Sequence, residues 1–114
     1  MRTFIIQESV NDDKRGWGQT LTRHIDILTE IKDRTLKDAS ELEDWKAEVN
    51  AAVNKAAKDI RDAMGASYAT RFLRTETWIG DYASGNVNRD HGGCRRNLDM
   101  HINNLRAIFD ALGN

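Results

Sequence analysis

The chain has 114 residues, of which 39% are apolar, and a formal net charge of −1. This length is typical of a single small domain, and the near-neutral charge argues against non-specific binding to nucleic acid. The single cysteine, Cys94, excludes an internal disulfide, and no segment reaches the roughly 20 apolar residues of a membrane span. We therefore expect a cytoplasmic protein with no membrane segment, cofactor or metal.

Residues 1–16 are predicted to form a short extended arm, because Asn and Asp at positions 11–13 interrupt the apolar pattern. Residues 16–18 (Gly-Trp-Gly) place an aromatic ring between two flexible residues, which is typical of a hinge. We expect Trp17 to pack on the core or act as a strap, with an interface anchor as the alternative. The bundle domain then covers residues 17–114.

Apolar residues recur every three or four positions in four later stretches, which is the helical period. The predicted helices cover residues 19–37, 40–64, 67–82 and 94–112. Ser40 and Glu43 have the spacing of a capping box, and Gly65 is expected to end the second helix as a left-handed C-cap. Turn-forming residues predict a loop over 84–93, and the other connections are short, which favours antiparallel neighbours. The sequence predicts an all-α fold, a four-helix, mostly antiparallel bundle with a short N-terminal extended arm.

No lysine follows Lys58, so the later basic side chains are arginines, which suit forked recognition of carboxylate or phosphate. The predicted ligand- or partner-binding residues are Arg71, Arg74, Arg89, Arg95, Arg96, Trp78 and Tyr82. In this interpretation the arginines neutralise a negative partner and the two aromatic rings supply contact area. Gly92 and Gly93 would expose backbone N–H groups at a helix start, where the helix dipole favours an anion. A solvated surface would show the same arginines, so that interpretation stays open.

Cys94 raises two further hypotheses. A thiol at a helix start beside arginines would have a lowered pKa, and His91 would be its base in a nucleophilic site. His91, Cys94 and His101 also offer three metal donors, but no second cysteine supports a structural zinc site. We expect instead an inert Cys94, His91 in a loop, His101 on a helix surface and a structural role for His24.

Residues 96–101 read Arg-Asn-Leu-Asp-Met-His, and this run resembles the R-x4-6-H motif of HEPN domains. These are all-α modules of bacterial toxins and CRISPR effectors. The resemblance implies a dimer that cleaves RNA without a metal by general acid–base chemistry. Arg96 and His101 would be catalytic and Asn97 would orient them.

A longer region, about residues 40–112, carries Leu42-x2-Trp45-x3-Val49, a break at Gly65, Tyr68-x3-Phe72 and then Leu98-x6-Leu105-x3-Phe109-x2-Leu112. It resembles a helical region that recurs in bacterial antiphage and abortive-infection proteins, often beside TIR-type domains. The resemblance implies an oligomerisation or regulatory module, or a phage-encoded mimic that blocks such a system. It assigns no functional residue.

From these patterns we predict a non-enzymatic, homo-oligomeric interaction module of a bacterial defence or phage counter-defence system. It would bind a protein partner or a phosphorylated, nucleotide-like ligand through the Arg-rich edge, for instance as an inhibitor. The alternative is a HEPN-type, metal-independent ribonuclease that acts on RNA as a dimer. A third possibility is a purely structural subunit.

Overall fold

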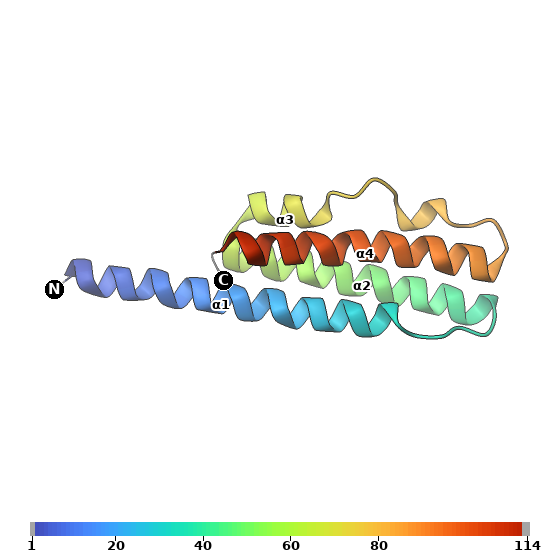
Figure 1. Cartoon of the computed structure of the whole chain (residues 1–114), viewed down its shortest axis with the longest axis horizontal. Coiled ribbons are helices and arrows are strands. Elements are labelled where there is room, and N and C mark those ends of the chain that lie inside the picture. The colour runs from blue at the N-terminus through green and yellow to red at the C-terminus, as the bar shows by residue number, and fades with distance from the viewer. Residues whose placement is uncertain (1, 113–114) are drawn as a thin grey trace.

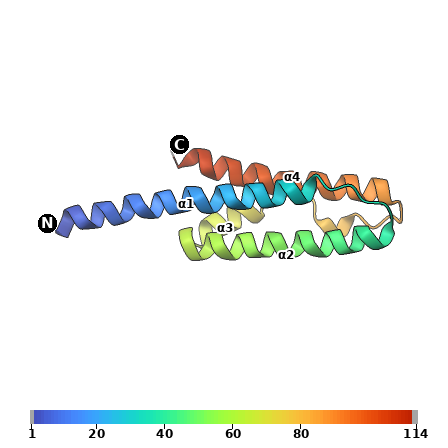
Figure 2. The same cartoon turned by 90° about the horizontal axis from the view of Figure 1, so that it is seen from below.

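The computed structural model describes the backbone of residues 2–112 and the side chains of residues 16–112. Its elements are α1 (Arg2–Lys32), α2 (Ala39–Met64), α3 (Ala66–Leu73), the 3-10 helix η1 (Ile79–Asp81) and α4 (Val87–Ala111). Three long helices lie side by side, with α1 antiparallel to α2 and α4, and the short α3 packs against α2 and α4 (Figures 1 and 2). The predicted all-α, mostly antiparallel four-helix bundle is confirmed.

One hydrophobic core holds the four helices together, because each turns an apolar stripe inward. Fully burying a Leu, Ile or Phe side chain contributes about 1.5–3 kcal/mol relative to exposure. The largest side chains that are almost entirely buried are Leu21, Leu28, Ile60, Phe72, Leu98, Ile102, Leu105 and Ile108.

The N-terminal segment is helical, so the expectation of an extended arm was wrong. The helix α1 begins at Arg2 and runs without a break through residues 16–18, since glycine weakens a helix but does not end it. Trp17 is half-buried, with its ring centroid 5.9 Å from that of Tyr68, in agreement with packing on the bundle. The side-chain packing of the predicted arm lies outside the described residues. At its other end α1 stops at Lys32, earlier than expected.

The N-cap of α2 is Asp38 rather than Ser40. The Asp38 Oδ1 accepts a hydrogen bond from the Glu41 N–H at 2.9 Å, and the Glu41 Oε2 accepts one from the Lys37 N–H at 2.7 Å. Both Asp and Ser are good caps, and the same spacing of cap and carboxylate occurs two residues earlier than expected. Gly65 ends α2 as expected, with its N–H directed at the carbonyls of Ile60 and Arg61. Its φ of +109° and ψ of 165° differ from the left-handed helical conformation expected of this C-cap.

Two expectations in the second half of the chain were wrong. The third helix ends at Leu73, well before Tyr82, and an irregular connection then leads to η1. The segment 84–93 is mostly helical rather than a loop, because α4 begins at Val87 with Asn86 as its cap. The Asn86 side chain accepts a hydrogen bond from the Arg89 N–H at 3.0 Å.

Among the helices of the described part of the chain, none combines the length and the apolarity that crossing a bilayer requires.

Candidate functional site

Three polar residues on one face of α4 hold the connection between α3 and η1. Asn97 donates a hydrogen bond to the Thr77 carbonyl, and Asn104 donates to the carbonyls of Phe72 and Arg74 at 3.0 and 2.8 Å. The His101 Nδ1 lies 3.1 Å from the same Phe72 carbonyl, so this nitrogen carries the proton. The spacing of these residues, four and then three positions, places them on one helical face. They replace the backbone hydrogen bonds that the connection lacks.

This arrangement separates the members of the HEPN-like motif. Asn97 and His101 are buried, and burial lowers the pKa of His101. Arg96 is exposed, and five residues along a helix correspond to a rotation of about 140° from His101. His101 lies under α3 rather than on its expected helix surface, and within one chain it does not face the same surface as Arg96.

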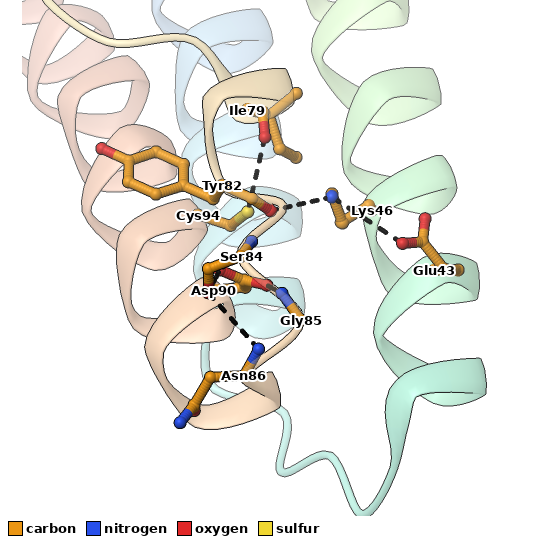
Figure 3. A network of polar contacts seen from close by, with 9 residues as sticks. All are labelled: Glu43, Lys46, Ile79, Tyr82, Ser84, Gly85, Asn86, Asp90 and Cys94. Atoms are coloured by element: carbon orange, nitrogen blue, oxygen red, sulfur yellow. Dashed lines mark hydrogen bonds and ion pairs between the residues drawn. The ribbon is translucent and has the colours of Figure 1, made fainter.

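A second polar network fixes the turn between η1 and α4 (Figure 3). The buried Asp90 carboxylate accepts hydrogen bonds from Ser84 Oγ and N at 2.7 and 3.0 Å and from the Gly85 N–H at 3.1 Å. These bonds, those from Ser84 first, hold the Asp90 pKa below its usual range. From α2, Lys46 Nζ donates to the Tyr82 carbonyl at 3.1 Å. This network is structural.

Cys94 lies in the core, so the hypothesis of a lowered thiol pKa was wrong. The Sγ is 3.8 Å from the Ile79 carbonyl, and burial raises the thiol pKa to about 11. His91 is on α4 rather than in a loop, and its ring meets Trp45 edge-on with centroids 4.8 Å apart. Across the described residues, no three His, Cys, Asp or Glu side chains gather in a way that would hold a metal ion.

The two glycines of the predicted anion site lie inside α4, not at its start. Their backbone N–H groups lie beyond the first four of the helix and are therefore used in hydrogen bonds within α4. A helix-start anion site at Gly92 and Gly93 is excluded. Gly93 has a different role, because a Cβ there would lie 2.1 Å from Cδ1 of Tyr82. A Cβ on Gly92 would meet no atom within 4 Å, so this glycine leaves open space on the surface.

A shallow hollow of about 290 Å³ lies at this open position, between α4 and the C-terminal end of α1. We call it the cationic hollow, and it is lined by Lys32, Gly92, Arg95, Arg96 and Asp99. Lys32 Nζ is 2.9 Å from Asp99 Oδ1, and an Arg95 nitrogen is 4.0 Å from Asp33 Oδ1. Arg96 makes no ion pair with any residue whose side chain the structure describes. The hollow therefore has more positive than negative charge.

The other predicted binding residues divide into two groups. Arg89 lies three residues before Gly92 and thus one turn away on the same surface of α4, and the Tyr82 ring covers the adjacent Gly93. Arg71 and Arg74 instead belong to α3 and its end, which pack along the C-terminal part of α4 (Figure 1).

Arg71 lies with its guanidinium 5.5 Å from the Tyr68 ring centroid. Trp78 is 72% exposed at the start of η1. The seven residues predicted as one edge therefore do not form a single site.

A hollow of opposite charge was missed from the sequence. It has a volume of about 390 Å³ and lies between the α1–α2 connection and the first turns of α2. We call it the acidic hollow, and it is lined by Arg34, Thr35, Leu36, Glu41, Asp44, Trp45 and Glu48. The available signal was the spacing of Glu41, Asp44 and Glu48, which puts three carboxylates on one face of α2.

Comparison with models of protein families, with curated proteins and with solved structures gives no match.

Proposed function

We propose that the chain is a non-enzymatic interaction module that binds an acidic protein surface at the cationic hollow. The observation that carries this proposal is the bare backbone at Gly92, flanked by Arg95 and Arg96 at the surface of α4. Guanidinium groups donate two parallel hydrogen bonds to one carboxylate, and here they border space that a partner's side chain would fill.

The shape of the site favours a protein over a small ligand. Pockets for small ligands are concave and bury most of the ligand's surface among apolar side chains. The cationic hollow is shallow, and apart from Gly92 its walls are charged side chains. A phosphorylated ligand is the other occupant that the arginines suit, and the experiment below separates the two.

Cys94 and His101, two of the side chains that suggested catalysis, are buried. A thiol with a pKa of about 11 is protonated at neutral pH, and only the thiolate is a good nucleophile. His101 is buried against the Phe72 carbonyl, so in one chain it does not reach a substrate at the surface. The place in bacterial defence or counter-defence follows only from the helical resemblance and stays a prediction.

The test is a titration followed by amide resonances in NMR, with an oligoglutamate peptide and inorganic phosphate as separate probes. We expect the peptide to shift the amides of Lys32 and residues 92–99. Arg95→Ala with Arg96→Ala should weaken binding roughly 2- to 30-fold, because an exposed ion pair contributes about 0.2–1 kcal/mol. The melting temperature should stay nearly unchanged.

A matched control removes the same charge elsewhere. Arg61 and Arg106 are exposed on α2 and α4 outside the hollow, so Arg61→Ala with Arg106→Ala should bind the peptide nearly as the natural chain does. Equal weakening in both double variants would reduce the effect to net charge and overturn the site. Phosphate binding tighter than peptide binding would favour the phosphorylated ligand over a protein.

A further inference from the structure

We propose that the acidic surface that occupies the cationic hollow is the acidic hollow of a second copy of this chain. This inference rests on the proposed function and names the partner of the same site. The two hollows lie on either side of the C-terminal end of α1, since Lys32 lines one and Arg34 lines the other. Both are therefore near the C-terminal end of α1, which stops short of the end of the bundle where α2 and α4 begin (Figures 1 and 2).

The charges of the two hollows are complementary. Three carboxylates and one guanidinium line the acidic hollow, whereas three cations and one carboxylate line the cationic hollow. The formal net charges of the two linings are therefore equal in size and opposite in sign.

Ion pairs within the chain already neutralise part of the charge in both hollows. Arg34 is bound by Glu30 and Glu48, and Lys32 is bound by Asp99. Asp44 in one hollow and Arg96 in the other make no hydrogen bond or ion pair with the side chains that the structure describes. These two residues are the charges that a second copy would pair.

The surface between the hollows fits the same partner. Glu30 on α1 and Asp33 just after it are exposed, with 64% and 62% of their side chains accessible, and Asp33 is already near Arg95. Glu30 borders the acidic hollow through Arg34, so its carboxylate adds to the negative surface that would face the arginines of a second copy. Asp33 lies beside Arg95 of the cationic hollow.

The proposed dimer has two-fold symmetry, in which the cationic hollow of each copy contacts the acidic hollow of the other. Each contact then forms twice, as in an isologous dimer, and no surface is left over for further growth. Without a two-fold axis the same contact would join copies head to tail into rings or filaments. Because the charges are exposed, salt should weaken the dimer strongly.

The experiment is sedimentation velocity of the full chain at about 0.01 M and about 1 M salt, where the Debye length is about 30 Å and 3 Å. We expect a dimer at low salt and a monomer at high salt. Arg96→Asp and Asp44→Arg should each be monomeric at low salt, because each variant places like charges opposite one another. An equimolar mixture of the two should dimerise again, since the mixed pair restores both contacts.

The controls are Arg106→Asp and Asp110→Arg, which change the same charges at exposed positions near the C-terminal end of α4. Both should remain dimeric at low salt, and circular dichroism should show unchanged helicity for every variant. A mixture that stays monomeric, or a natural chain that is monomeric at both salt concentrations, overturns the proposal. Species larger than a dimer at low salt overturn the two-fold arrangement.

The outcome separates this inference from the proposed function. If the natural chain is monomeric but the oligoglutamate titration still depends on Arg95 and Arg96, the hollow binds another acidic protein and only self-association fails. If neither the peptide nor a second copy binds, both proposals fail.

Discussion

The Tyr82 ring lies directly on the backbone of Gly93, so that a Cβ at residue 93 would be only 2.1 Å from Cδ1 of the ring. This contact seats the C-terminal end of η1 on α4. Gly93→Ala should therefore destabilise the protein by about 1–3 kcal/mol, since the ring must move out of its place. Urea unfolding measures the loss, and in the Tyr82→Ala background the same substitution should cost much less.

Substitution of the neighbouring Gly92 by alanine should instead stabilise the protein. A side chain at Gly92 meets no atom within 4 Å, and alanine is favoured over glycine in a helix by about 0.5–1 kcal/mol. Gly92→Ala should raise the free energy of unfolding by about that amount in the same assay. Gly92→Leu should keep the fold but fill the cationic hollow, so peptide binding should fall without any change in charge. A destabilised Gly92→Ala would contradict the open surface described at this position.

Asn97 should matter for stability rather than for chemistry. Its amide is buried and bonded to the Thr77 carbonyl, which also accepts a hydrogen bond from Thr75 Oγ1. Asn97→Ala therefore removes one buried hydrogen bond without leaving the carbonyl unpaired, at a cost of about 0.5–1.5 kcal/mol. Asn103 is exposed on the same helix, and Asn103→Ala should change stability by less than about 0.5 kcal/mol. Thermal unfolding of the two variants provides the comparison, and equal melting temperatures would show that the contact with Thr77 contributes nothing.

The Cys94 thiol should be unreactive in the folded protein. It is fully buried and its pKa is raised to about 11, so at pH 8 the thiolate is scarce and inaccessible. A disulfide reagent should modify native protein only as fast as the core opens, and urea-unfolded protein at the rate of a free thiol. Rapid modification of native protein would revive the nucleophile hypothesis.

Stability should fall as the pH drops below about 6.5. Burial lowers the pKa of His24, His91 and His101 below the usual histidine value of about 6.5, although the Asp59 carboxylate partly opposes this for His24. The unfolded chain then binds protons that the folded chain does not, and the free energy of unfolding decreases with falling pH. Urea unfolding between about pH 7.5 and 5 measures the slope, where the unfolded histidines titrate.

A single substitution tests the origin of this slope. His91→Phe keeps a ring against Trp45 and removes one titrating group, so stability should depend less steeply on pH. At lower pH a further loss is expected as Asp59 and Asp90 are protonated, because the pKa of each is lowered in the folded state. A flat profile from pH 7.5 to 5 would contradict the burial of the histidines.

The helical period alone located α2 and the core stripe of α4, because both depend on spacing within one segment. The start of α4 was misplaced for the opposite reason. Its first residues are turn formers, and they are helical because Asp90 binds Ser84 and Gly85 and because the Tyr82 ring covers Gly93. Such tertiary contacts outweigh the preference of these residues for turns, and they produce no periodic pattern in the sequence.

The candidate site could be predicted only in part, because it also depends on contacts between distant parts of the chain. Arg95 and Arg96 were recognised as surface arginines, but the hollow beside them depends on the approach of Lys32 from a distant helix. Asn97 and His101 resembled a catalytic motif in the sequence. Their partners Thr77 and Phe72 lie 20 and 29 residues away, so the contacts that explain them are visible only in the folded chain.

The connection between α3 and η1 is attached to the rest of the molecule mainly by side chains, whereas the long helices carry continuous backbone ladders around a shared core. Elements of that kind open at lower free energy than the global unfolding transition. The amides of residues 74–86 should thus exchange with deuterated solvent well before those in the middle of α2 and α4. Residues 74–86, which comprise this connection, η1 and the turn before α4, would then detach as one unit while the three long helices stay folded.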